Sequence, residues 1–475
     1  MAKTYFNFGN TLQAAADCRL NNATIVDLWH GFTHFTGKLE LSEGRANAFY
    51  TEGMEIPQVP DGKEYIITVT EKGVAVAGRD YRCLARGVMV LMMQIEFTCL
   101  EEGKETFRIA VGTMESQYTI DNRMIHFCVF PETTPLFLKK CLRLAGVMQY
   151  THVVLEYWGM LKYDCLKELA WANAFSKDDA KAFAQEIEDM GMEAIPMMNH
   201  LGHAAACRVS GGKHVVLDQN PRLADLFSYD GWSWNIESQK AHDLLKEVRK
   251  ELYEVFPAAT YFHLGCDEVY SYEKGDEDQR RMRNFLHDLI EEVKAEGKTP
   301  IIWGDMLLNA EAAGVDSRRQ VPRPAQPYFC GCDTPENAEK MIEAIPKDTV
   351  IADWHYDVME TPIRTSVYLR DKGFRVLGAP WFKDPNCQAH VNTVRDEKLF
   401  GLMVTTWHTL AEKMPHIMTD ALMCGAHQSP WSGTSGTKIR TELGTLLRKV
   451  CFVNGDYKEA GFTENQIFLQ ANPMV

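Results

Sequence analysis

From about residue 116 onward, apolar segments of strand-like composition alternate with amphipathic helical segments. This alternation is the strongest constraint on the fold, because parallel strands need long crossover connections, which are usually helices. The pattern predicts eight strands, at residues 124–130, 152–157, 193–198, 260–264, 299–303, 349–353, 375–379 and 402–406. Eight strand–helix units in roughly 300 to 350 residues are typical of a TIM (β/α)8 barrel with some long loops.

Local signals mark the ends of the intervening helices. Ser176 precedes Asp178 and Asp179, which is typical of an N-cap followed by an acidic first turn, and residues 334–336 read Thr-Pro-Glu, an N-cap with proline at the first helical position. A doubly wound open sheet is the competing fold. It would require a glycine-rich phosphate turn after its first strand, and residues 131–134 read Pro-Glu-Thr-Thr. The barrel is therefore favoured.

Two further regions flank the predicted barrel, which takes residues 116–430. Residues 1–115 are predicted to form a small α+β domain, with a hairpin at 65–70 and 74–78 followed by a buried helix at 84–97. Residues 431–475 are predicted to be a C-terminal helical extension, because 437–450 has an amphipathic pattern. The fold class is thus α/β, with a small α+β domain ahead of the barrel.

Composition and charge narrow the classes of partner. The 475 residues are 45% hydrophobic, and 50 basic against 65 acidic residues give a net charge of −15. Without a Lys/Arg-rich run, nucleic-acid and membrane partners are disfavoured. Residues 1–10 lack an apolar signal segment and no apolar run of about 18 residues occurs, so we expect a cytoplasmic location. The thirteen cysteines form no C-x-x-C pair, which favours buried free thiols.

An Asp-Glu pair directly follows the fourth predicted strand. Residues 263–269 read His-Leu-Gly-Cys-Asp-Glu-Val. Because side chains alternate along a strand, Asp267 and Glu268 can act on one substrate only where the strand ends. TIM-barrel enzymes carry their catalytic residues at that end of the strands. Most Asp-Glu pairs are exposed surface, but this context predicts a catalytic pair.

Tryptophans follow the last four predicted strands. Trp303, Trp354, Trp381 and Trp407 each lie at a predicted C-terminal strand end, where the loops of a barrel form its pocket. The C–H faces of a pyranose ring are apolar and pack on aromatic rings. This pattern indicates a sugar-binding pocket, with plain packing of the barrel mouth as the alternative, above all for Trp303.

Together these segments resemble glycoside hydrolase family 20, the β-N-acetylhexosaminidases. Residues 263–268 are similar to its His-x-Gly-Gly-Asp-Glu signature, and Cys266 in place of the second glycine resembles the hexosaminidase D branch. The likeness covers most of residues 116–410 and reaches the small domain at 64–81. Other matching segments occur in the expected order: Glu156 at the second strand, Gly202-His203 after the third, Trp303-Gly304-Asp305 after the fifth, and Trp354 with Tyr356 after the sixth.

The resemblance implies an exo-acting β-N-acetylhexosaminidase that releases terminal β-linked GlcNAc or GalNAc with retention. Two adjacent carboxylates cannot easily flank a sugar ring, but substrate assistance removes that need, since the 2-acetamido oxygen attacks the anomeric carbon and forms an oxazolinium intermediate. Glu268 is then the general acid and later the base, while Asp267 accepts the acetamido N–H. Glu268 must hold a proton near neutral pH while Asp267 stays ionised. No metal or other cofactor is required.

The resemblance also implies a substrate-binding set. His203 supports the catalytic acid, Tyr356 hydrogen-bonds the acetamido oxygen, and His263 orients the residues around it. Glu156 binds sugar hydroxyls, with an ion pair at the barrel rim as the alternative. The full set is His126, Glu156, His203, His263, Trp303, Trp354, Tyr356, Trp381 and Trp407.

Three departures from the family pattern leave the identity of the sugar open. His126 lies on the strand where many relatives have an arginine that grips sugar hydroxyls. Residues 197–199 read Met-Met-Asn in place of acidic positions, and His408-Thr409 replaces a glutamate. These sites govern the choice between gluco and galacto epimers. A sulfated or unacetylated hexosaminide therefore stays an alternative substrate.

Two functions of other classes compete with this interpretation. A non-catalytic carbohydrate-binding barrel would keep the tryptophans without needing Glu268. A different barrel enzyme, such as a metal-dependent lyase or a hydrolase with two separated carboxylates, would share the fold but not the acetamido pocket. The sequence leaves open whether the chain forms a homodimer.

Overall fold

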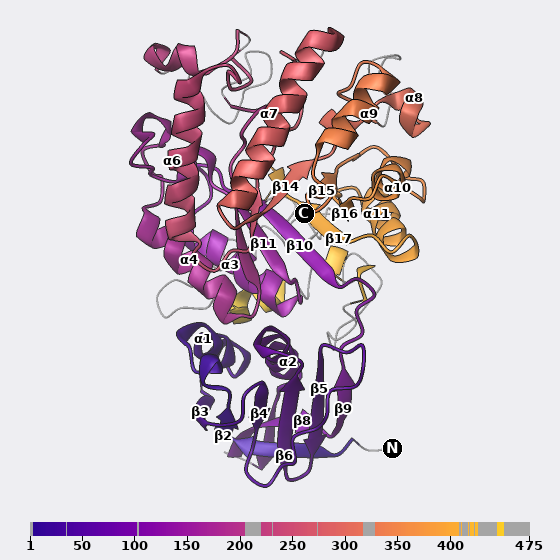
Figure 1. Cartoon of the computed structure of the whole chain (residues 1–475). Coiled ribbons are helices and arrows are strands. Elements are labelled where there is room, and N and C mark those ends of the chain that lie inside the picture. Colours follow the sequence, from indigo (N-terminus) through magenta and orange to yellow (C-terminus); the bar gives the residue numbers. More distant parts are fainter. Residues whose placement is uncertain are drawn as a thin grey trace, which may run out of the picture.

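The computed structural model describes residues 3–34, 36–101, 104–204, 220–229, 231–272, 274–316, 328–407 and 444–450, with further single positions between 410 and 425. A small N-terminal domain lies below a barrel in the view of Figure 1. Most of the predicted C-terminal extension, 431–475, lies outside the described residues. No described helix combines the length and the apolar character that crossing a bilayer would need.

The barrel is a closed ring of eight parallel strands, which confirms the predicted fold and shows the open-sheet alternative to be wrong. Strand β10 pairs with β11 on one side and β17 on the other, so Met124 lies between His152 and Met403. Each strand lies within two residues of its prediction. The strands are β10 (Asn122–Cys128), β11 (His152–Glu156), β12 (Glu193–Met197), β13 (Tyr261–His263), β14 (Thr299–Trp303), β15 (Val350–Asp353), β16 (Arg375–Gly378) and β17 (Gly401–Thr405).

Helices cover the outside of the ring. The expected caps form: the Ser176 side chain accepts the N–H of Asp179 in a capping box, and Thr334 caps the helix that starts at Pro335. Buried faces of these helices pack on near-continuous apolar strands, as parallel sheets require. The helices are α3 (Pro135–Val147), α4 (Lys177–Asp189), α6 (Gln239–Val255), α7 (Gly275–Ala295), α8 (Ala310–Ala313), α9 (Pro335–Ala344), α10 (Arg364–Asp371) and α11 (Asp384–Asp396).

The small domain holds a six-stranded sheet in the order β3-β2-β4-β6-β5-β9 and a three-stranded sheet in the order β1-β8-β7. The predicted hairpin is confirmed, with Tyr65 opposite Gly78. The predicted helix at 84–97 instead spans Tyr81–Met93, because a strand starts at Glu96. The elements are β1 (Tyr5–Gly9), β2 (Thr11–Ala16), α1 (Ala23–Phe32), β3 (Lys38–Glu43), β4 (Ala48–Tyr50), β5 (Tyr65–Thr70), β6 (Gly73–Gly78), α2 (Tyr81–Met93), β7 (Glu96–Glu101), β8 (Lys104–Ala110) and β9 (Gly112–Glu115).

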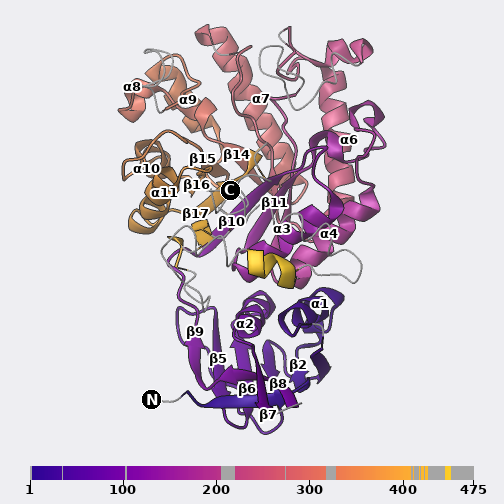
Figure 2. The same cartoon turned by 180° about the vertical axis from the view of Figure 1, so that it is seen from behind.

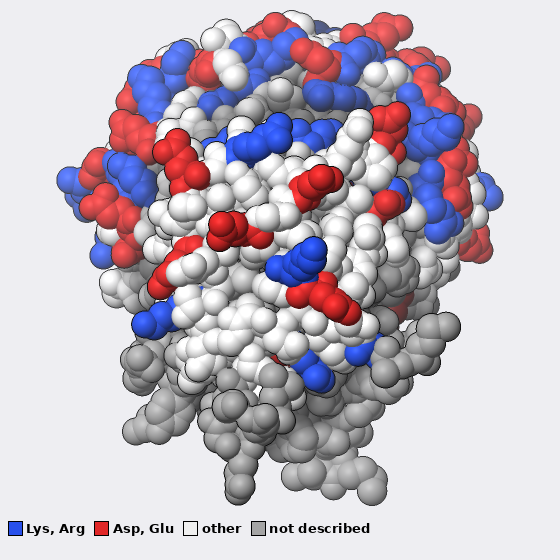
Figure 3. All heavy atoms as spheres, turned by 90° about the horizontal axis from the view of Figure 1, so that it is seen from below, with Lys and Arg blue, Asp and Glu red and all other residues white. Residues whose placement is uncertain are grey.

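Helices α1 and α2 lie on the barrel side of the sheet (Figures 1 and 2). All residues of α2 from Cys83 to Met93 are buried, because one side of the helix packs on β5 and β6 and the other on α3. Seen from below, the described surface carries scattered acidic and basic side chains without a continuous basic patch (Figure 3). The cysteines that the structure describes are all free, and all but Cys18 and Cys165 are buried.

A buried ion triad joins the two domains. Glu64 of the small domain contacts Arg86 of α2 and Arg123 of β10, each at 3.0 Å. Burial opposes the charge on Glu64, but the two guanidinium groups outweigh it and lower the pKa of the carboxyl. Arg86 also donates to the carbonyl of Gly191 at 3.0 Å. The triad therefore places the sheet, α2 and the first barrel strand in one fixed arrangement.

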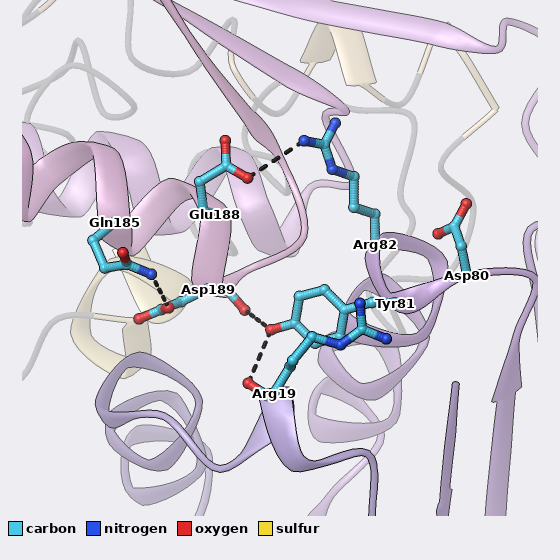
Figure 4. A pocket seen from close by; sticks show the side chains of 7 residues that line it. All are labelled: Arg19, Asp80, Tyr81, Arg82, Gln185, Glu188 and Asp189. Carbon is cyan, nitrogen blue, oxygen red and sulfur yellow. Dashed lines mark hydrogen bonds and ion pairs between the residues drawn. The ribbon is translucent and has the colours of Figure 1, made fainter. Parts of the chain in front are cut away.

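A second polar contact lies beside it, around a pocket of about 590 Å³ between α2 and α4 (Figure 4). Arg82 reaches across to Glu188 at 3.4 Å and to Glu193 at 3.0 Å. The Tyr81 hydroxyl donates to the carbonyl of Asp189 at 2.8 Å. Because these side chains bind one another, the pocket lining serves to hold the domains together.

Replacing Glu64 by Gln should destabilise the protein by about 3 kcal/mol, because it leaves two buried guanidinium groups without a counter-charge. We expect a thermal unfolding midpoint several degrees lower by calorimetry. The matched control is Glu247→Gln, which breaks the exposed pair with Lys250 and should leave the midpoint unchanged. Equal shifts in both variants would contradict a special role for the triad.

Candidate active site

The chain turns sharply where β13 ends, and this turn presents the two carboxylates. Gly265, Cys266 and Glu268 all have positive φ, at +69°, +72° and +47°. A side chain at Gly265 would place its Cβ 1.6 Å from Oδ1 of Asn199, so only glycine fits. The left-handed backbone at Glu268 is costly for a residue with a side chain and is held by its surroundings. The turn lets neighbouring side chains reach the same spot.

Asp267 and Glu268 share a single imidazole nitrogen. Nε2 of His203 lies 3.2 Å from Oδ2 of Asp267 and 3.3 Å from Oε2 of Glu268. The Asp267 side chain is 5% exposed, whereas that of Glu268 is 27% exposed. Burial alone would lower the pKa of His203, but the two carboxylates outweigh it and raise that pKa to about 10. The imidazole therefore carries a proton at neutral pH.

Asp305, which follows β14, holds the turn through a hydrogen bond to its backbone. Its Oδ2 accepts the backbone N–H of Glu268 at 2.9 Å, and its Oδ1 accepts the indole N–H of Trp354 at 3.2 Å. The side chain is fully buried, and burial together with the charge of Asp267 raises its pKa well above the ordinary value. One carboxyl thus couples the backbone of the predicted acid to a predicted wall of the sugar pocket.

Four predicted aromatic residues form a continuous wall near this group. Trp354 lies 5.2 Å from Tyr356 between ring centroids, and Tyr356 lies 5.4 Å from Trp381. The indole N–H of Trp407 donates to the Tyr356 hydroxyl at 2.8 Å. Burial raises the pKa of Tyr356 well above its ordinary value, so its hydroxyl stays protonated. The structure brings these rings together from the ends of β15, β16 and β17.

The remaining predicted site residues are fully buried inside the barrel. Nε2 of His126 lies 2.8 Å from Oε2 of Glu156, and the His126 ring lies 4.9 Å from that of Trp407. Trp303 packs between His263, at 4.6 Å, and Trp407, at 5.5 Å. The side chains of His126, Glu156, His263 and Trp303 are fully buried and pack behind the wall, and their contact with a substrate stays a prediction.

Sequence reasoning did not assign a role to several aromatic residues near the acid. Trp232 lies 4.3 Å from His203 between ring centroids and donates its indole N–H to the carbonyl of Glu268 at 2.8 Å. Tyr270 and Phe329 extend the same group of rings. Tyr270 could have been found from the sequence, because it follows Glu268 by two residues. Trp232 and Phe329 lie on loops that are distant in the sequence, so no local pattern connects them to the acid. His408 and Thr409 lie outside the described residues.

Two sets of described residues bring three metal-ligating atoms within 4.8 Å of one another: His126, Cys128 and Glu156, and His203, Asp267 and Glu268. A metal binds neutral imidazole, whereas the neighbouring carboxylates favour the protonated form of His203. In the other set, Nε2 of His126 is already engaged by Glu156. The chemistry of the His203 set therefore fits a proton better than a metal.

Residues 147–361 match the model of the glycosyl hydrolase family 20 catalytic domain. The matched segment, 215 of the 475 residues, is similar to that domain. The chain is 25% identical over 181 residues to a lacto-N-biosidase of Bifidobacterium bifidum, covering 34% of this chain and 16% of that protein. It is 23% identical over 216 residues to hexosaminidase D of Bos taurus, covering 42% and 58%. The matches thus span less than two thirds of either relative.

Solved structures show the same fold over nearly the whole chain. An exo β-N-acetylglucosaminidase from Vibrio harveyi, bound to N-acetylglucosamine, matches with a TM-score of 0.63 at 13% identity, over 98% of this chain and 76% of that one. The β-N-acetylhexosaminidase of Streptomyces coelicolor matches with a TM-score of 0.60 at 15% identity, over 94% and 93%. Both matches take in the small domain as well as the barrel.

His203 should remain protonated through neutral pH and titrate near pH 10, because two carboxylates share its Nε2. Its contribution to stability is complete below about 6.5 and is lost as the pH rises through about 10. Histidine ¹⁵N NMR checks this, and Asp267→Asn or Glu268→Gln should each lower the pKa. His263 is the internal control, since burial lowers its pKa to about 3 and keeps it neutral throughout. Titration of His203 near 6.5 would contradict the shared-proton arrangement.

Proposed function

We propose that this chain is an exo-acting β-N-acetylhexosaminidase that hydrolyses terminal β-linked GlcNAc or GalNAc. The observation that carries the proposal is the contact of Asp267 and Glu268 with one nitrogen of His203, beside the wall of Trp354, Tyr356 and Trp407, on a segment similar to the family 20 catalytic domain. The similarity to hexosaminidase D and to β-N-acetylglucosaminidases supports the same activity.

The closeness of the two carboxylates favours a substrate-assisted mechanism. Inverting glycosidases hold their two carboxyl groups about 6.5 to 9.5 Å apart, with room for a water between them. Here the carboxylate oxygens and Nε2 of His203 lie within 4.8 Å of one another. Both carboxylates also reach the same nitrogen of His203, so neither is left for the opposite face of a sugar. The nucleophile on the opposite face of the sugar is then the acetamido oxygen of the substrate itself.

The different exposure of the two carboxylates assigns their roles. Glu268 is the more exposed, so it can reach the glycosidic oxygen, donate a proton to the departing sugar and later take a proton from water. Asp267 is buried, accepts the acetamido N–H, and its negative charge stabilises the oxazolinium ring. Two successive displacements at the anomeric carbon return the original configuration.

His203 holds the proton of this cluster in the substrate-free protein. Nε2 of the imidazole, which carries this proton, lies 3.3 Å from Oε2 of Glu268. Substrate binding buries Glu268 further and gives Asp267 the acetamido N–H as a new donor, so the proton is favoured on the glutamate. The Tyr356 hydroxyl, protonated and oriented by Trp407, donates to the acetamido oxygen and aims it at the anomeric carbon.

Glu268→Gln and Asp267→Asn should each lower kcat/KM on an N-acetylhexosaminide by 10²-fold or more, on the order of the loss of an acid or of a charge-stabilising group. The assay compares the wild type and both variants on β-linked GlcNAc, GalNAc, sulfated and unacetylated glycosides. A thiazoline mimic of the cyclised intermediate should inhibit the wild type. Full activity of Asp267→Asn would rule out substrate assistance, and preference for an unacetylated or sulfated glycoside would identify the alternative substrate.

Asp305→Asn should lower kcat about tenfold or more. Each oxygen of Asp305 accepts one buried N–H group, whereas the amide of asparagine has a single oxygen for both. Leaving one buried N–H group unpaired costs about 1–3 kcal/mol. In a Trp354→Phe background the indole donor is gone, so the same substitution should cost much less. The double-mutant cycle measures this difference. An equal loss in both backgrounds would show that Asp305 does not couple the wall to the acid.

A further inference from the structure

Three metal-ligating side chains meet inside the barrel, behind the aromatic wall. His126, Cys128 and Glu156, here called the floor cluster, each offer one ligand atom, and these atoms all lie within 4.8 Å of one another. All three residues are fully buried. A tetrahedral zinc ion with N, O and S ligands holds them about 3.3–3.8 Å apart, so adjustments of about 1 Å bring the three atoms onto one ion.

The strands of the barrel fix the arrangement of the floor cluster. His126 and Cys128 are two residues apart on β10, so their side chains point to the same face. Cys128 pairs with Glu156 of β11 in the sheet register, which brings the carboxylate beside the thiol. Both of these residues end their strands. The cluster therefore lies in the layer of the barrel core that is nearest the proposed site.

The charges of the floor cluster match a divalent cation. When they bind a metal, Cys128 is a thiolate and Glu156 is a carboxylate, and together they neutralise the two positive charges of the ion. A neutral assembly avoids most of the cost of burying a charge in the barrel. The sulfur ligand favours zinc, because magnesium and calcium prefer oxygen ligands.

The histidine of the cluster has a nitrogen available for a cation. Without a cation, Nε2 of His126 lies 2.8 Å from Oε2 of Glu156, a distance at which the two atoms share a proton. Within the described residues, Nδ1 of His126 has no hydrogen-bond partner. The ring proton can therefore move to Nδ1, and Nε2 becomes a ligand. Binding of zinc then releases the thiol proton of Cys128.

We propose that the floor cluster is a zinc site. Its three protein ligands leave the fourth position of the ion to a water molecule. The ion holds β10 to β11 and fixes the ring of His126, which lies 4.9 Å from that of Trp407. Trp407 in turn orients the hydroxyl of Tyr356. Zinc thus stabilises the barrel and the wall without taking part in the proposed reaction, so the inference does not rest on the proposed function.

The first test measures metal in the full chain, produced with zinc in the medium and passed over a chelating resin. The wild type should retain about one zinc ion per chain by plasma mass spectrometry. Cys128→Ser should retain about a tenth of that or less, because a hydroxyl is a poor ligand for zinc. Glu156→Gln is a second variant that should lose zinc. The matched control is Cys141→Ser, at an equally buried cysteine on α3, which should keep it.

Cobalt provides a spectroscopic test, because Co²⁺ accepts the same N, O and S ligands as zinc. The cobalt-loaded wild type should show the near-ultraviolet charge-transfer band of a thiolate–cobalt bond, and Cys128→Ser should lack it. Asp267→Asn should keep both the zinc and the band, because Asp267 belongs to the His203 set.

Three results would overturn the zinc proposal. They are a wild type that retains no zinc, zinc retained by both Cys128→Ser and Glu156→Gln, and zinc lost from Asp267→Asn but kept by Cys128→Ser. The last of these would assign the metal to the His203 set. Each result is read from metal content, so it is independent of whether the protein hydrolyses an N-acetylhexosaminide.

Discussion

The sharing of one imidazole nitrogen by Asp267 and Glu268 is the interaction on which the rest of the site depends. It requires two consecutive residues to point to the same place, which regular strand geometry forbids. The left-handed turn after β13 makes it possible. Gly265 lets the turn pass close to Asn199, and Asp305 holds it through the backbone N–H of Glu268. The protonated His203 then allows two carboxylates to stay close without repelling each other.

Closure of the barrel brings the aromatic wall and Asp305 next to this turn. Because all eight strands end at the same rim, rings that follow β15, β16 and β17 meet the carboxylates that follow β13. Asp305 connects the two sides by accepting one N–H from each. The buried His126–Glu156 pair and Trp303 fill the interior beneath and leave the wall little freedom to move. The small domain braces β10 and α4 at the other end of the barrel through Glu64 and Arg82.

Much of the fold was predictable, because the local sequence patterns along the barrel are consistent with one another. Apolar runs, caps such as Ser176 and helical periodicity located all eight strands within two residues. The helix at 81–93 was placed too far along the chain, since its apolar pattern continues into the strand at Glu96. The catalytic pair and His203 were predicted together, and the structure places them in contact. The roles of Asp305, Trp232 and Phe329 were missed, because a hydrogen bond or ring contact between distant loops leaves no local pattern.

The sequence by itself determined the barrel class, the position of Asp267 and Glu268 after a strand, and the aromatic residues at the ends of the last four strands, because periodicity and residue chemistry are local properties. Only the tertiary structure decided which groups share a proton and which rings form the wall. It also buried His126, Glu156, His263 and Trp303 and left Tyr270 exposed. The reason is that burial and pKa depend on distances between segments far apart in the chain, which exist only once the barrel has closed.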